Sequence, residues 1–122
     1  MVAYNPAYKK LLVYQRTHAL VLRIYSITKS YPKDEQFALI SQMRRAAVSV
    51  PANLIEGWAR QTVKEKRNFY HIARGSLAEL IYYLDLSRDL KYAAEKDLSD
   101  IEQLAFETAR LLQGLINKFV IP

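Results

Sequence analysis

The chain contains no cysteine, and only three of its 122 residues are glycine and two are histidine. The absence of cysteine excludes disulfide frameworks, thiolate zinc sites, iron–sulfur clusters and cysteine nucleophiles, and it favours a cytoplasmic location. The three glycines, at positions 57, 75 and 114, cannot form a glycine-rich phosphate loop, and no serine lies in a nucleophile elbow. The sequence therefore predicts a protein that is not an enzyme and that needs no cofactor.

Metal-binding and membrane-spanning patterns are also missing. His18 and His71 fall on separate predicted helices without an acidic pair at metal-ligand spacing. The Glu-x-x-His pattern of di-iron carboxylate bundles does not occur. Lysine or arginine interrupts each apolar run near the N-terminus before it reaches the length of a signal-peptide core or a membrane span. We expect no metal, no export signal and no membrane partner.

Positive charge is concentrated in the first part of the chain. Residues 1–76 hold 13 Lys or Arg and 4 Asp or Glu, whereas residues 77–122 hold 5 and 8, and the formal net charge is +6. A basic surface attracts polyanions and raises their rate of association. The composition favours a nucleic-acid partner, although basicity of this size also occurs in proteins without that role.

Four long segments have the hydrophobic spacing of amphipathic helices, and none alternates with a period of two for long. They are expected over residues 6–30, 33–59 and 62–92, and from a start between residues 94 and 99. The connections between them are short, so neighbouring helices should be antiparallel. The sequence predicts one domain over residues 1–122, an all-α, up-down antiparallel four-helix bundle.

Two local features refine this prediction. Thr62 and Glu65 have the spacing of a capping box, which marks the start of the third helix. Pro51 falls inside the second helix and predicts a kink between Ala47 and Pro51. The alternative is two shorter helices with a break at Val50.

The first predicted helix is apolar over an unusually broad arc. Its polar residues recur at seven-residue spacing on one stripe, and apolar residues cover the rest. A helix that is buried on several sides in so small a chain is expected at a subunit interface. We assign to this interface Leu12, Val13, Leu20, Ile24 and Ile27. The alternative is a central helix in a monomer.

Four stretches carry a resemblance to a known family. Residues Gln42–Gly57, QMRRAAVSVPANLIEG, resemble the most characteristic stretch of the four-helix-bundle family named for 23S rRNA intervening sequences. Tyr8–Gln15, Tyr31–Lys33 and Ala73–Leu80 agree with the same family. The resemblance spans nearly the whole chain and is weakest between residues 91 and 103.

The resemblance implies an up-down four-helix bundle that assembles as a ring-like homopentamer. Some members of the family are encoded within insertions in large-subunit ribosomal RNA genes. A related branch is similar to the accessory proteins of diversity-generating retroelements, which are pentameric basic barrels that work with a reverse transcriptase and its template RNA. The partners implied are further copies of the chain, RNA or DNA, and a protein partner.

Seven cations are the candidate nucleic-acid contacts: Arg44, Arg45, Arg60, Lys64, Lys66, Arg67 and Arg74. The guanidinium groups of the first two match phosphate oxygens in a bidentate way. Their alternative role is a structural ion pair with Glu56, with Glu79 or with a residue of a neighbouring subunit.

The other five cations form the densest basic cluster in the sequence. Tyr70 and His71 lie beside them and are candidates for stacking on unpaired bases. The alternative is a solvated helix face with ordinary aromatic packing.

The leading hypothesis is a non-catalytic, homo-oligomeric bundle that binds nucleic acid, with RNA favoured, through backbone charge and shape. The first rival is a structural or protein-interaction scaffold, and the second is an accessory subunit of a reverse-transcriptase retroelement. The leading hypothesis requires that the cations of the first three-fifths of the chain converge in space and are not individually neutralised by carboxylates.

Overall fold

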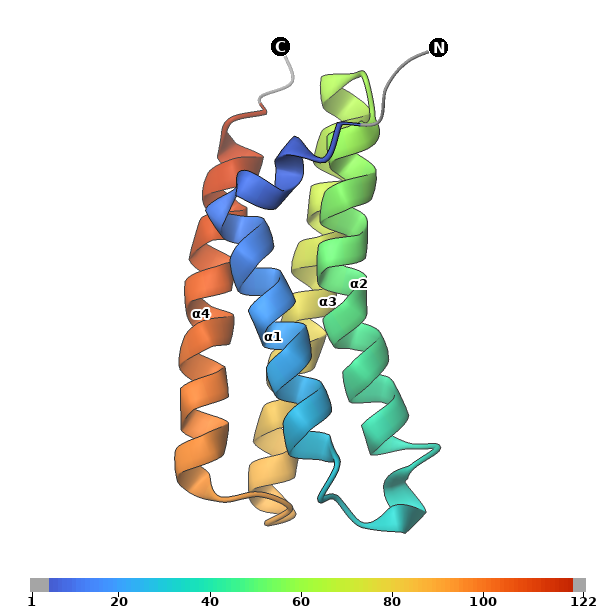
Figure 1. Cartoon of the computed structure of the whole chain (residues 1–122), viewed down its shortest axis with the longest axis vertical. Coiled ribbons are helices and arrows are strands. Elements are labelled where there is room, and N and C mark those ends of the chain that lie inside the picture. The colour runs from blue at the N-terminus through green and yellow to red at the C-terminus, as the bar shows by residue number, and fades with distance from the viewer. Residues whose placement is uncertain (1–4, 120–122) are drawn as a thin grey trace.

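The computed structural model describes residues 5–119, and these form an all-α bundle (Figure 1). The helices are α1 (Leu12–Thr28), α2 (Leu39–Ala59), α3 (Val63–Asp89) and α4 (Glu95–Asn117). Two short 3-10 turns, η1 (Ala7–Lys10) and η2 (Lys33–Glu35), precede α1 and α2. No strand occurs among the described residues, and the predicted up-down four-helix bundle is confirmed.

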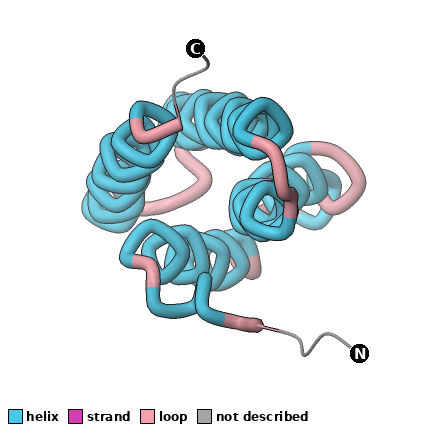
Figure 2. The backbone as a smooth tube through the Cα atoms, turned by 90° about the horizontal axis from the view of Figure 1, so that it is seen from above, coloured by secondary structure: helices cyan, strands magenta, loops and turns pink. Residues whose placement is uncertain are grey.

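The helices surround one common axis, and each packs against two neighbours (Figure 2). α1 and α3 each contact α2 and α4, so α1 and α3 are diagonal to one another. The α2–α3 turn, η1 and the C-terminal end of α4 lie at one end of the bundle, which we call the upper end because it is uppermost in Figure 1. The α1–α2 and α3–α4 connections lie at the other end, the lower end.

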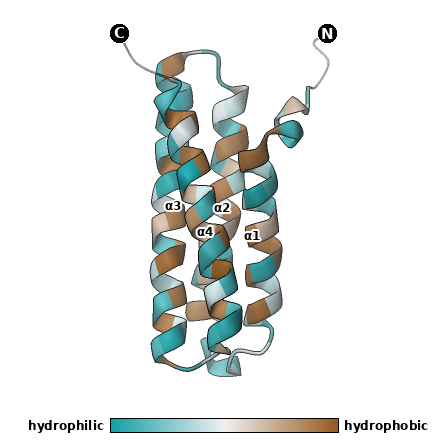
Figure 3. Cartoon of the chain, turned by 90° about the vertical axis from the view of Figure 1, so that its left-hand side faces the viewer, coloured by the Kyte–Doolittle hydropathy of each residue, from teal (hydrophilic) through white to brown (hydrophobic). Residues whose placement is uncertain are grey.

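The core is formed by one apolar stripe from each helix. Hydrophobic and hydrophilic residues are interleaved along the helices in Figure 3, as expected when one side of each helix is buried. Each fully buried large side chain contributes about 1.5–3 kcal/mol relative to exposure. The largest of these residues are Leu20, Ile24, Met43, Leu54, Tyr70, Leu77, Leu80, Leu84, Leu98, Ile101, Leu112 and Ile116.

The first two helices start later than the sequence predicts. Leu11 has an extended backbone, with ψ 132°, and separates η1 from α1, so the helix is not continuous from residue 6. Residues 33–35 form only the turn η2, and α2 begins at Leu39, which is the first buried residue after Tyr31. Because helices in proteins depend on packing, the exposed residues 32–34 and 36–38 cannot sustain a helical turn of α2.

α2 runs through Pro51 without interruption, so the alternative of two helices broken at Val50 is wrong. Near this proline the side-chain amide of Asn53 donates to the carbonyl of Ser49 at 2.8 Å and to its hydroxyl at 3.0 Å. The Ser49 hydroxyl also shares a 2.8 Å hydrogen bond with the hydroxyl of Ser76 on α3. Polar side chains therefore link α2 to α3 beside the proline turn.

The start of α3 is as predicted. The Thr62 hydroxyl accepts a 3.1 Å hydrogen bond from the backbone N–H of Glu65, which confirms the threonine half of the capping box. This cap satisfies one of the free N–H groups of the first helical turn.

Gly57 allows α2 and α3 to approach closely at the upper end. A Cβ atom at this position would lie 2.6 Å from Cε1 of Tyr70 and 3.2 Å from the carbonyl oxygen of Lys66. The Tyr70 ring is only 1% exposed and packs against Phe119, with 5.6 Å between ring centroids. The ring therefore has little room to move away.

Gly57→Ala is expected to lower the free energy of unfolding by about 1–2 kcal/mol, because overpacking outweighs the gain in helix propensity. Gly75→Ala is the matched control, since a Cβ there meets nothing within 4 Å. That substitution should raise the stability by about 0.5–1 kcal/mol. Urea denaturation measures both, and a loss of stability in both variants or in neither would contradict the packing argument.

Candidate nucleic-acid interface

The basic cluster lies at the upper end, where α2 turns into α3. Lys64, Lys66, Arg67 and Arg74 project from the first half of α3, and Arg60 is the C-cap of α2. The structure therefore brings these five predicted contacts into one region. The exposed residues Lys9 and Lys10 of η1 and Lys118 at the end of α4 add positive charge at the same end.

Two of these cations have a structural role. Lys66 Nζ donates to the carbonyl of Trp58 at 2.9 Å, in the last turn of α2. Arg67 donates to the carbonyls of Ile116 at 3.1 Å and Phe119 at 2.7 Å, at the end of α4. The last carbonyls of a helix lack intrahelical donors and carry partial negative charge, so both interactions are favourable. Lys66 and Arg67 thus cap the ends of α2 and α4. Fewer donors of these two side chains are therefore left for phosphate.

The remaining three cations of the cluster differ in their partners. Arg60 forms an ion pair with Glu56 at 2.6 Å, and its guanidinium lies 4.7 Å from the centroid of the Phe69 ring. Arg74 donates to the neutral side chain of Gln113 at 2.7 Å. Lys64 is exposed and has no side-chain partner among the described residues. Within residues 5–119, only Arg60 of the five is neutralised by a carboxylate.

Lys64, Arg67, Asn68 and His71 line an open surface cavity of about 260 Å³ on α3. Burial, followed by the positive charges of Arg74 and Arg67, lowers the pKa of His71. The shift favours the neutral form of the imidazole, which has one ring N–H to donate. Asn68 is not among the predicted contacts, although its spacing from Lys64 and His71 places it on the same helix face.

The two predicted stacking residues are separated. His71 is partly exposed in this cavity and remains available to a base. The Tyr70 ring is buried against Phe119 and beside Gly57, so the prediction that it stacks on a base is wrong. The two side chains point in different directions because successive residues on a helix are about 100° apart.

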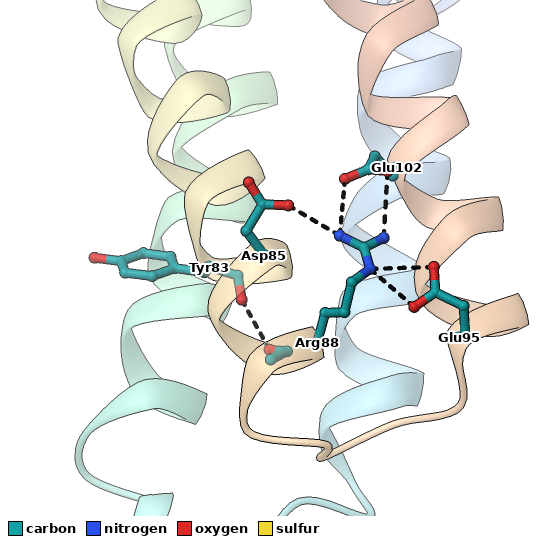
Figure 4. Close-up of polar contacts among 6 residues, drawn as sticks. Tyr83, Asp85, Arg88, Glu95 and Glu102 are labelled. Carbon is teal, nitrogen blue, oxygen red and sulfur yellow. Dashed lines mark hydrogen bonds and ion pairs between the residues drawn. The ribbon is translucent and has the colours of Figure 1, made fainter.

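Carboxylates gather at the lower end. Arg88 forms ion pairs with Asp85 at 2.9 Å, with Glu95 at 2.9 Å and with Glu102 at 3.3 Å, which ties α3 to α4 (Figure 4). Hydrogen bonds to Glu95 and then to Glu102 raise the pKa of Arg88 above its usual range. These three carboxylates therefore lie at the opposite end of the bundle from the basic cluster.

Arg44 and Arg45 lie apart from the basic cluster. Arg44 Nε donates to the Thr28 hydroxyl at 3.0 Å, and its guanidinium lies 4.7 Å from the centroid of the Tyr25 ring. Arg45 is exposed and has no side-chain partner among residues 5–119. Both arginines line a cavity beside Tyr25, in the groove between α1 and α2, whereas Arg67 and Arg74 face α4. The structure does not join the two basic regions within one chain.

The predicted subunit interface on α1 needs correction. Val13, Leu20 and Ile24 are 7%, 0% and 0% exposed, because they pack in the core of the single chain. A second copy cannot reach them while the bundle is folded. Leu12, which is 45% exposed, and the partly buried Ile27 remain accessible.

Within residues 5–119 no group of three or more acidic or histidine side chains has the proximity that a metal ion requires. None of the helices in this part of the chain combines the length and apolarity needed to cross a membrane.

Arg67→Met is expected to lower the free energy of unfolding by about 1–2 kcal/mol, because it removes the hydrogen bonds from a charged group to two helix-end carbonyls. Lys64→Met, three residues earlier on α3, removes a cation without a side-chain partner in the described part of the chain and should change the stability by less than about 0.5 kcal/mol. Urea denaturation of both variants tests the capping role. Equal stability of the two variants would assign Arg67 to the solvated surface.

Comparisons with known proteins agree with this architecture. A crystal structure of a protein of unknown function from the S23 ribosomal protein family of Bacteroides thetaiotaomicron has a TM-score of 0.80 and 22% sequence identity, over 87% of this chain and 96% of that chain. No match was found among curated proteins. Residues 9–114 match the family described as 23S rRNA-intervening sequence protein. The chain belongs to this family.

Proposed function

We propose that the protein is a non-catalytic, homo-oligomeric bundle that binds nucleic acid, RNA in particular, through the basic cluster at the upper end. The observation that carries this proposal is the distribution of ion pairs among the described residues. At the upper end only Arg60 of the five predicted cations is paired with a carboxylate, whereas three carboxylates gather around Arg88 at the lower end. The upper end therefore keeps an excess of positive charge.

The chemistry of the cluster favours the phosphate backbone over base edges. Lys64 and Arg74 are exposed and hold donors that face solvent, and His71 offers a neutral N–H or a ring face beside them. Such groups contact phosphate and stack on unpaired bases without reading a sequence. The name of the family, which refers to 23S rRNA, favours RNA over DNA.

The rival function is a structural or protein-interaction scaffold. The two caps formed by Lys66 and Arg67 favour it, because they account for part of the basic cluster without any ligand. Titration with a structured RNA at low salt separates the two functions. Binding that weakens steeply with salt supports the proposal, and absence of binding supports the scaffold.

Lys64→Gln and Arg74→Gln are each expected to weaken RNA binding by about fivefold at 0.1 M salt and to reduce the salt slope by about 0.7–0.9 for each phosphate that is no longer neutralised. Fluorescence anisotropy across a salt series measures both quantities. Lys33→Gln is the matched control, because it removes one exposed lysine from the lower end and changes the net charge equally. If the control weakened binding as much, net charge alone would explain the affinity and the upper-end site would be wrong.

A further inference from the structure

The open cavity on the first half of α3 combines two kinds of polar side chain. Lys64 and Arg67 are cations and can only donate hydrogen bonds. Asn68 and His71, which line the same cavity, can also accept them. The lowered pKa of His71 favours its neutral form, in which one ring nitrogen donates and the other accepts. Neither Asn68 nor His71 has a side-chain hydrogen bond among residues 5–119, so both remain available to a ligand.

This combination of groups suits more than a phosphate. The oxygens of a phosphodiester only accept hydrogen bonds, so the acceptor atoms of Asn68 and His71 would find no donor on it. A nucleobase carries donors and acceptors along its edges, and its flat face stacks on an imidazole ring. The side-chain amide of Asn68 can turn about its last torsion, so it can match the edges of different bases. Donor and acceptor groups beside two cations therefore fit a nucleotide, with its base and its phosphate.

Arg67 is a pre-organised part of this cavity. Its Nη1 group is held by the carbonyls of Ile116 and Phe119 at the end of α4. Its Nε and Nη2 groups have no acceptor in the part of the chain that the structure describes. An arginine whose conformation is already fixed loses little side-chain entropy when it binds a ligand. Lys64, which lies one turn earlier on α3, adds a second and unconstrained cation.

The ring of His71 has open space on the side of the next turn of α3. A helical side chain covers the turn that precedes its own Cα, so a side chain at position 75 would lie over His71. Gly75 has none, and a Cβ there would meet nothing within 4 Å. Within residues 5–119 His71 has no aromatic partner, whereas the ring of His18 is stacked on Tyr14 with 6.1 Å between centroids. The imidazole of His71 is therefore free to stack on a ligand.

The size of the cavity limits what it can hold. Cavities that enclose a whole small-molecule ligand measure about 300–1,000 Å³. This cavity, of about 260 Å³, is smaller and open to the surface. It therefore fits one part of a longer ligand, such as a single base of a strand that continues along α3. The bases of an RNA duplex are paired and stacked on one another, so only an unpaired base can enter.

We propose that this cavity is a subsite for one unpaired nucleotide of single-stranded RNA. The base stacks on His71 and forms hydrogen bonds with Asn68. The adjoining phosphates contact Lys64 and Arg67. Stacking of this kind tolerates any base, because every base has a flat face. The proposal rests on the RNA binding of the proposed function and adds to it a contact that only a strand with unpaired bases can make.

His71→Ala tests the stacking, with a short fluorescein-labelled oligouridylate as the single-stranded probe in anisotropy titrations. The variant should bind this strand about tenfold more weakly, because stacking on one base is lost. Its salt slope should equal that of the wild type, since no phosphate contact is removed. Two further probes isolate the base: a strand in which abasic sites replace the uridines, and a duplex of the oligouridylate with oligoadenylate. The wild type and His71→Ala should bind each of these two probes with equal affinity.

His18→Ala is the matched control, because the ring of this second histidine is already stacked on Tyr14 of α1, outside the cavity. It should leave the affinity for all three probes unchanged. Gly75→Leu covers His71 without removing it, so it should weaken binding of the single strand alone, and urea denaturation should show no loss of stability. This variant keeps the test decisive if His71→Ala does not fold. Asn68→Leu should weaken binding of the single strand by about threefold and leave the abasic strand unaffected.

An equal loss of affinity for the abasic strand or the duplex in His71→Ala would overturn the proposal, because His71 would then contact the backbone. Wild-type affinity for the single strand in both His71→Ala and Gly75→Leu would also overturn it. In either case a reduced salt slope in Lys64→Gln would leave the proposed function standing. If none of the probes binds the wild type at low salt, the proposed function and the nucleotide subsite are both wrong.

Discussion

The upper end of the bundle depends on the place where α3 begins. The Thr62 cap starts the helix, and Lys66 and Arg67 then reach carbonyl groups at the ends of α2 and α4. Gly57 lets the Tyr70 ring of the same helix approach α2 closely. The first turns of α3 therefore hold three helices together, and the remaining cations of this segment are positioned on a fixed frame.

The same frame explains the electrostatics of the molecule. Lys66 and Arg67 interact with backbone carbonyls, which carry only partial charge, so their interactions reduce the positive potential of the upper end without removing it. At the lower end Arg88 lies among three carboxylates, whose combined formal charge exceeds its own. Burial is the main cause of the lowered pKa of His71, and the positive charges of Arg74 and Arg67 at the upper end lower it further.

The fold was predictable from the sequence because the apolar spacing of each helix and the Thr62 cap are local signals. The start of α2 was not predictable, because Asp34 and Glu35 resemble the acidic first turn of a helix. Only the tertiary packing shows that the helix begins at Leu39. The position of the basic cluster was predictable, but the partners of Arg67 lie 49 and 52 residues away and are backbone atoms. No pattern of residue types could reveal such partners.

The broad apolar arc of α1 shows why burial and assembly are hard to separate in a sequence. Its inner residues, Leu20 and Ile24, are fully buried in the bundle, whereas Val21 and Tyr25, one residue further along, line the outer groove with α2. Both sets are apolar, and they differ by about 100° around the helix. A helix of a small bundle needs only one buried stripe to fold, so the apolar character of the second stripe does not follow from the packing of the core.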